Sequence, residues 1–304
     1  MRKYPVLVLA GALSGACGGV SAQTPAPNPM PDGSYDMYAG LGVRSAPNYE
    51  GSRERGLRLT PVLQIAWGNG VFISGMSAGM HLSPLPGLEF GPLLSVHAAR
   101  SKDGSSVFDT PVDATGAGTG STILPPKAVT TSSASTGATG VDVAAPGTWY
   151  KVRRIGPRLE GGAFLNYYLT RQLRLTNNLL YGAGDGRDGL RWTLDLQRTA
   201  FEVAPHQKLS LAVGVTVVNR AYNTSYFGLR DNEIVTVPGP SLPYRPGGGV
   251  KDVHASLRWN WALSPSLLLT TGVHAARLAG DAKASPLAGR AGDVTVSTAL
   301  AYRF

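Results

Sequence analysis

Apolar and polar residues alternate along most of this chain, in segments of about ten residues. In the clearest segment, residues 252–261, every even position is polar and every odd position is apolar: Val253, Ala255, Leu257, Trp259 and Trp261. A period of two is that of a β-strand, whose successive side chains point to opposite faces. The alternation predicts strands at residues 35–44, 57–67, 71–82, 88–100, 159–169, 173–181, 190–197, 209–217, 251–261, 267–278 and 293–304.

The composition excludes helical architectures. Of 304 residues, 43% are hydrophobic and only 15% are charged, and the chain has 39 glycines and 22 prolines. This much glycine and proline is incompatible with long helices. After the first two dozen residues, no apolar run reaches the roughly 18 residues that a membrane-spanning helix needs. Neither an all-α protein nor a helical membrane protein fits.

The polar faces of the expected strands are rich in Gly, Ser, Thr, Asn and Arg and poor in Lys and Glu. A soluble sandwich would expose more lysine and glutamate, so these faces suit a hydrated lumen. A closed barrel is the one sheet that satisfies all its backbone groups in lipid. We therefore predict an all-β protein, an antiparallel transmembrane β-barrel of about 12 strands and of outer-membrane type, over residues 34–304. Because such barrels usually have an even strand number, a twelfth strand is expected at residues 149–155.

Residues 1–22 have the features of a cleaved signal peptide. A positively charged start precedes an apolar run at residues 6–16, and Val20-Ser21-Ala22 forms a small-residue cleavage site. A lipidated Cys17 is a competing interpretation, but Ser14 stands where lipoprotein signals usually carry leucine. Cleavage would leave a chain without cysteine and hence without disulfides. We expect an exported outer-membrane protein whose proline-rich residues 23–33 form an extended N-terminus.

The final segment resembles the terminal strand of bacterial outer-membrane barrels. Its residues alternate back from an aromatic last residue, and Val296, Leu300, Tyr302 and Phe304 share one face. The resemblance implies an assembly signal that the barrel-insertion machinery reads.

Residues 101–148 form a low-complexity segment of mainly Ser, Thr, Gly and Ala. Such a segment buries too little apolar area to offset its ordering entropy, so we expect a mobile loop insertion. A tolerated insertion is favoured over an adhesive or shielding loop. If residues 149–155 form a barrel strand, this loop lies on the periplasmic side of the membrane. If they do not, it lies outside the cell, and the sequence leaves both alternatives open.

Charged residues of the polar faces are candidates for lining the lumen. The candidates are Arg44, Arg58, Arg174, Arg191, Arg258, Asp195 and Asp252, with Asp36 and Glu160 as further acidic partners. Structurally, these charges would pair across the lumen and hold the barrel shape. Functionally, the arginines could line a narrow, anion-preferring pore.

Catalytic and metal chemistry find little support in the sequence. His254 and Ser256 share a strand face at about 7 Å, which is near but not bonded, and Asp252 is expected to flank the imidazole ring without orienting it. The histidines make no metal-ligand pair with carboxylates at close spacing, and no cofactor motif is present. Basic residues are scattered, so nucleic acid is not indicated as a partner. The sequence predicts a non-enzyme.

Several short motifs resemble the MipA/OmpV family, in the family's order and over nearly the whole expected mature chain. The positions that carry the resemblance are Tyr49, Gly51, Tyr226, Phe227, Gly228, Leu278, Gly280, Asp281, Ser285 and Pro286. The resemblance implies an outer-membrane barrel, one of whose members is an MltA-interacting protein that scaffolds a murein transglycosylase beside a murein synthase. Other members resemble porin-like or stress-associated surface proteins. Residues after Gly228 and the long 101–148 segment depart from the family pattern.

Two non-enzymatic functions therefore compete. The first is a scaffold that binds cell-wall (murein) turnover enzymes through periplasmic turns such as 203–207 and 262–265. The alternative is a small, narrow porin-like channel with an Arg-lined lumen. The net charge of +9 also favours contact with outer-membrane lipid and phosphate-bearing lipopolysaccharide.

Overall fold

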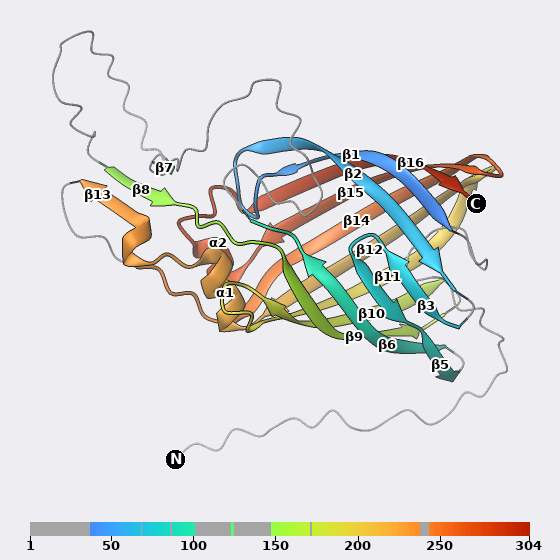
Figure 1. The fold of residues 1–304 in the computed structure, drawn as a ribbon, viewed down its shortest axis with the longest axis horizontal. Coiled ribbons are helices and arrows are strands. Elements are labelled where there is room, and N and C mark those ends of the chain that lie inside the picture. The colour runs from blue at the N-terminus through green and yellow to red at the C-terminus, as the bar shows by residue number, and fades with distance from the viewer. Residues whose placement is uncertain are drawn as a thin grey trace, which may run out of the picture.

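The computed structural model describes residues 37–67, 69–85, 87–100, 123–124, 147–170, 172–237 and 243–304. Its main sheet has thirteen strands, all antiparallel to their neighbours, and β4 and β5 follow one another along the same edge of β6 as one interrupted strand. The β1–β16 and β4–β6 pairings close the sheet into a barrel of twelve strands (Figure 1). The predicted fold class is confirmed.

The barrel strands are β1 (Tyr38–Pro47), β2 (Arg55–Ala66), β3 (Val71–Ser74), β4 (Ser77–Met80), β5 (Leu82–Leu85), β6 (Leu88–His97), β9 (Arg158–Tyr168), β10 (Leu173–Ala183), β11 (Gly189–Ala204), β12 (Gln207–Val218), β14 (Gly249–Ser264), β15 (Leu267–Leu278) and β16 (Gly292–Arg303). Each β-strand therefore follows one of the segments in which apolar and polar residues alternate, except at residues 71–85.

The twelfth strand comes from a turn that the alternation conceals. Residues 71–82, expected as one strand, contain the hairpin β3–β4, which turns at Gly75 and Met76. Gly75 has a φ of 57°, which favours glycine because a side chain is strained there. Apolar or small residues occupy both faces of this stretch, so hydropathy does not show the change of parity at the turn.

The expectation of a barrel strand at residues 149–155 is wrong. Instead, β8 (Gly147–Lys151) pairs with β13 (Ile234–Val237) and β7 (Ile123–Leu124) in a separate three-stranded sheet. Because the hairpin at Gly75 already supplies the even strand number, the barrel has no place for this segment.

The two ends of the barrel differ in their connections. At the turn end, β1 begins, β16 ends, and turns of two to four residues join β9 to β10, β11 to β12 and β14 to β15. The opposite loop end carries the long connections 98–157, 219–248 and 279–291. In outer-membrane barrels short turns face the periplasm and long loops face outward. The connection that contains the 101–148 segment starts and ends at the loop end; apart from residues 123–124 and 147–148 that segment lies outside the described residues, as do residues 1–36.

Side chains alternate between the two faces of the wall. On β14, Val253 and Leu257 are 50% and 38% exposed on the outer face, whereas Asp252 and Asn260 are 5% and 2% exposed on the lumen face. Exposed apolar side chains continue around the other strands. A continuous apolar exterior of this size is stable against hydrocarbon and not against water.

Three short helical segments lie at the loop end (Figure 1): α1 (Arg220–Phe227), the 3₁₀ helix η1 (Asp231–Glu233) and α2 (Gly280–Ala284). Within the part of the chain that the structure describes, no helix is long and apolar enough to cross a membrane.

Candidate functional site

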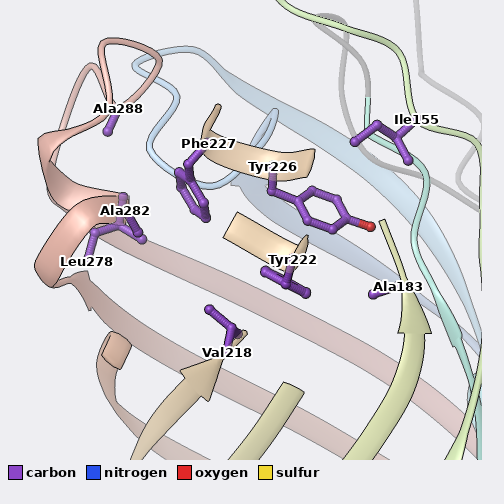
Figure 2. Close-up of a cluster of buried hydrophobic side chains, with 9 residues drawn as sticks. All are labelled: Ile155, Ala183, Val218, Tyr222, Tyr226, Phe227, Leu278, Ala282 and Ala288. Carbon is purple, nitrogen blue, oxygen red and sulfur yellow. The ribbon is translucent and has the colours of Figure 1, made fainter. Parts of the chain in front are cut away.

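A plug of packed side chains lies at the loop end of the barrel. We define the plug as α1, α2 and the residues packed against them. Its buried apolar members are Ile155, Ala183, Val218, Tyr222, Tyr226, Phe227, Leu278, Ala282 and Ala288 (Figure 2). The rings of Tyr222 and Tyr226 lie 4.5 Å apart, and His97 stacks on Tyr226 at 4.9 Å. Burial of large side chains on this scale excludes water from the interior of the plug.

Helix α1 is fixed to the barrel rim at its first turn. Asn219 caps the helix by accepting a hydrogen bond from the Tyr222 N–H at 2.9 Å, and the same oxygen accepts from the Leu190 N–H at 3.0 Å. The amide nitrogen of Asn219 donates to the Asp188 carbonyl at 2.9 Å. One side chain therefore caps the helix and joins it to the β10–β11 connection.

The positions that carry the family resemblance meet in and around the plug. Ser285 Oγ donates to the Phe227 carbonyl at 2.6 Å, and the Gly51 N–H donates to Asp293 at 2.8 Å. Asp281 accepts from the Gly247 N–H at 2.6 Å. Gly228 ends α1, Gly280 begins α2 with a φ of 47°, and Leu278, Tyr226, Tyr49 and the half-buried Pro286 belong to the same end of the barrel.

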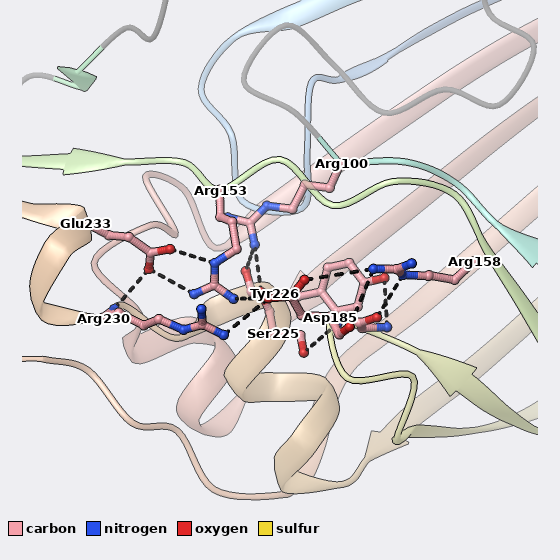
Figure 3. Close-up of polar contacts among 9 residues, drawn as sticks. Arg100, Arg153, Arg158, Asp185, Ser225, Tyr226, Arg230 and Glu233 are labelled. Carbon is pink, nitrogen blue, oxygen red and sulfur yellow. Dashed lines mark hydrogen bonds and ion pairs between the residues drawn. The ribbon is translucent and has the colours of Figure 1, made fainter.

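An ion-pair network covers the plug on its outer side (Figure 3). Arg153 forms two hydrogen bonds to Glu233, at 2.6 and 2.9 Å, and a third to Asp185 at 3.2 Å. Asp185 also accepts from Arg230 at 3.2 Å. Burial would raise the pKa of Glu233, but the bonds from Arg153 and Arg230 outweigh it, so the Glu233 pKa lies below its usual range.

Two polar side chains in the plug interior, Tyr226 and Arg100, keep their protons at neutral pH. Burial raises the pKa of Tyr226 to about 12, so its hydroxyl stays protonated. Arg100 donates to the carbonyl of Tyr226 and lies 5.3 Å from the ring centre of Tyr49. Burial lowers the pKa of Arg100 to about 10, which leaves it charged at neutral pH.

The lumen contains a polar cavity of about 370 Å³. Its lining includes Arg174, Asp195, His254, Ser256, Arg258 and His274. His254 bridges two carboxylates, Asp195 and Asp252, each at 2.8 Å. The carboxylate of Asp252 also forms an ion pair with Lys251 at 2.8 Å. Lys251 in turn forms an ion pair with Glu50 in the β1–β2 loop. A chain of alternating charges therefore runs from the cavity to the loop end.

Gly214 makes this chain possible. It lies on β12 between Asp195 and His254 in the strand register. A Cβ at this position would lie 2.7 Å from His254 Nε2, so any larger residue would collide with the Asp195–His254 pair.

The arginines predicted to line the lumen have different partners in the structure. Arg191 pairs with Glu160 at 2.6 Å. Arg174 donates to Gln197 at 2.8 and 3.1 Å, and Arg258 lines the cavity. Arg44 and Arg58 stand directly opposite one another on β1 and β2. Asp195 and Asp252 pair with His254, and Asp36 lies outside the described residues.

Hydrolase chemistry at Ser256 is disfavoured by this geometry. Both ring nitrogens of His254 are bonded to carboxylates, so the ring has no lone pair directed at the serine hydroxyl. The expectation that Asp252 flanks without orienting the ring is wrong, because Asp252 holds Nδ1. No group of three His, Cys, Asp or Glu side chains among the described residues is placed to hold a metal ion.

The last strand carries the expected assembly-signal residues on the outer face. Val296, Leu300, Tyr302 and Phe304 are 40%, 45%, 56% and 65% exposed. β16 pairs with both β15 and β1, so it is also the strand that closes the barrel.

Sequence reasoning missed two parts of the site. Asp195 and His254 lie on β11 and β14, on either side of β12, and they meet across that strand. The glycine at position 214 of β12 is the sequence signal that could have predicted their contact. The roles of Asn219, Tyr222 and His97 in the plug depend on contacts between distant segments, for which the sequence has no local pattern.

A closed twelve-stranded wall, apolar outside and polar inside, with a plug at the loop end, defines an outer-membrane-type β-barrel. The family model described as MltA-interacting protein MipA matches residues 39–304. The chain therefore belongs to the MipA family, which confirms the resemblance seen in the sequence.

Comparison with solved structures finds barrels of low sequence similarity. The NanC porin is 8% identical with a TM-score of 0.40, covering 87% of this chain and 100% of that chain. The KdgM porin is 8% identical with a TM-score of 0.37, covering 88% and 99%. The outer membrane channel DcaP of Acinetobacter baumannii is 9% identical with a TM-score of 0.35, covering 88% and 96%. No curated protein matches the chain.

Proposed function

We propose that this protein is a non-enzymatic interaction protein of the outer membrane that holds a murein-turnover enzyme at the periplasmic face. The plug carries this proposal. Because the buried side chains of α1 and α2 pack against the ends of β10, β12 and β15, an open axial pore for solutes is disfavoured. The family description names an MltA-interacting protein; we take that partner as the murein transglycosylase that the sequence resemblance implies, and binding of a murein synthase beside it extends the same role.

The turn end is the surface on which we place the partner. Val203, Leu263 and Leu169 are 49%, 42% and 50% exposed near its short turns. Short turns offer little area each, so the contact would combine several of them with the N-terminal residues before β1. Binding here leaves the loop end and its plug unchanged.

Export and insertion belong to the same proposal. Cleavage of residues 1–22 would deliver the chain to the periplasm, and the barrel-insertion machinery would recognise the outer face of β16. The basic net charge favours lipopolysaccharide as the surrounding lipid.

Affinity capture tests the scaffold directly. The detergent-solubilised full chain should retain purified murein transglycosylase, and the double variant Val203→Glu/Leu263→Glu should lose most of this binding. Val250→Glu is the matched control, since Val250 is 43% exposed but lies at the loop end of β14. Equal capture by the double variant and the control, or no capture by the wild type, would refute this role.

A second candidate is a narrow, anion-preferring channel, which the polar cavity with Arg174 and Arg258 favours. Liposome swelling distinguishes it from the scaffold. A channel would admit gluconate faster than the neutral sugar arabinose, and Arg258→Gln would reduce that preference. The scaffold predicts no swelling with either solute.

A further inference from the structure

A pocket lined by arginines lies beside α1 at the loop end of the barrel. We call it the arginine pocket. It has a volume of about 370 Å³, and its charged lining residues are Arg153, Arg220, Arg230, Arg245 and Asp231. Leu229, Pro243 and Tyr244 supply an apolar wall. Apolar walls with a few converging charged groups are typical of sites for small molecules.

Hydrogen bonds fix the walls of the arginine pocket. Leu229, directly after α1, exchanges two backbone hydrogen bonds with Tyr244, at 2.9 and 3.1 Å. The Tyr244 hydroxyl donates to the Asp281 carbonyl, on α2, at 2.8 Å. The segment that carries Arg245 is therefore tied to both helices of the plug. A pocket that is already formed in the free protein lowers the entropic cost of binding.

Two of the arginines are held in place by carboxylates (Figure 3). Arg153 donates to Glu233 and Asp185, and Arg230 donates to Asp185. A guanidinium has more N–H groups than these bonds use. Arg153 and Arg230 can therefore donate to a ligand while their own positions stay fixed.

The other two arginines supply the positive charge of the pocket. Arg220, the first residue of α1, and Arg245 are exposed, and neither forms an ion pair with any residue that the structure describes. Asp231 is the one carboxylate among the lining residues. Single surface arginines are ordinarily solvated by water, but these two line the same pocket. The pocket therefore favours an anionic ligand.

The chemistry of arginine favours a phosphate group in this position. The planar guanidinium presents N–H groups in a fork that matches phosphate oxygens. A phosphate monoester carries a charge of about −1.5 to −2 and three acceptor oxygens, so it can bind two guanidinium groups together. The apolar wall next to them suits the ring of a sugar.

We propose that the arginine pocket binds a phosphorylated sugar. The phosphate binds Arg220 and Arg245, and the sugar ring lies against Tyr244. The loop end faces outward, so the ligand is either the phosphorylated sugar head group of an outer-leaflet lipid or a soluble sugar phosphate outside the cell. The site goes beyond the scaffold role, since it lies at the end of the barrel opposite to the turn end.

Isothermal titration calorimetry of the full chain in dodecyl maltoside, with glucose 1-phosphate as the probe, tests the site. The wild type should bind the probe saturably and should not bind glucose. Arg220→Gln/Arg245→Gln should weaken binding at least about tenfold, as expected when bonds to a charged group are lost. The control is Arg187→Gln/Arg290→Gln, which removes two exposed loop-end arginines that do not line the pocket. Equal affinity in all three proteins, or no binding by the wild type, would overturn the proposal.

Chemical modification of one folded variant separates the loss of charge from misfolding. Cys17 is the one cysteine of the chain, so Arg245→Cys in a Cys17→Ser background carries a single thiol. Aminoethyl methanethiosulfonate restores a positive charge at this position, and sulfonatoethyl methanethiosulfonate introduces a negative one. The cationic product should bind glucose 1-phosphate at least about tenfold more tightly than the anionic product. Equal affinity of the two products would contradict the site.

Competition distinguishes the two sources of the ligand from a simple anion site. Diphosphoryl lipid A in mixed micelles should displace glucose 1-phosphate if the ligand is a lipid head group. If lipid A does not displace the bound probe, the site takes soluble sugar phosphates. Inorganic phosphate should compete more weakly than glucose 1-phosphate, because it has no ring to lie against Tyr244. Equal competition by inorganic phosphate would contradict a sugar-phosphate site.

Discussion

The wall of the barrel and the plug at its loop end depend on different kinds of information. In the wall, each strand is defined by a two-residue pattern, and apart from the closing β1–β16 pair all paired strands are consecutive strands of the barrel. In the plug, Ser285 bonds to Phe227 and Gly51 to Asp293, across 58 and 242 residues. The membrane-spanning part therefore follows from local patterning, whereas the packing of the loop end depends on distant contacts.

The largest effect should come from breaking the charge pair in the wall beneath the plug. Glu160 is fully buried and its partner is Arg191. Arg191→Ala leaves a buried carboxylate without its counter-charge, so the free energy of unfolding should fall by about 3–5 kcal/mol in urea titrations. The double variant Arg191→Met/Glu160→Leu should recover most of that loss. If the double variant were no more stable than the single one, the pair would not be the cause.

A charge on the lipid face of the wall should have the next largest effect. Leu257→Arg places a guanidinium in hydrocarbon and should cost roughly 2–4 kcal/mol of unfolding free energy. Ser256→Arg, one residue away on the lumen face, should cost much less. Equal losses at the two positions would show that the faces of the wall are wrongly assigned.

Gly214 tests the close approach across β12. Gly214→Ala forces Asp195 and His254 apart, and we expect a loss of about 1–3 kcal/mol, typical of overpacking, together with a shifted His254 imidazole resonance. Gly161→Ala is the control, because its nearest neighbour would be Leu94 Cδ2 at 3.7 Å, an ordinary contact. An unchanged His254 resonance in Gly214→Ala would contradict the proposed bridge.

The smallest effect should be confined to the plug. The Glu233 pKa is lower in the folded protein than in the unfolded chain, so its contribution to stability is present above the usual glutamate pKa of about 4.3 and is lost as pH falls further. Hydrogen exchange of the α1 amides should therefore accelerate below about pH 4 while exchange in β14 changes little. Glu233→Gln should abolish this difference in pH dependence. Equal acceleration in the wall would mean that the plug does not open separately.

The sequence predicts the wall far better than the plug. Alternation predicted the strands and their faces, but both faces of residues 71–82 are apolar or small, so the turn at Gly75 was hidden and a twelfth strand was sought at 149–155. The family motif identified Tyr226, Phe227 and Ser285 without showing that they meet. Such contacts follow from how the closed barrel brings its loops together, and no local period encodes that arrangement.

Single-channel recording in planar bilayers tests most directly whether the plug closes the barrel. The wild type should show no stable conductance, and Tyr222→Ala/Tyr226→Ala, which removes the two adjacent buried rings of α1, should show stable openings. Steady conductance in the wild type that the double variant does not increase would contradict a closed loop end.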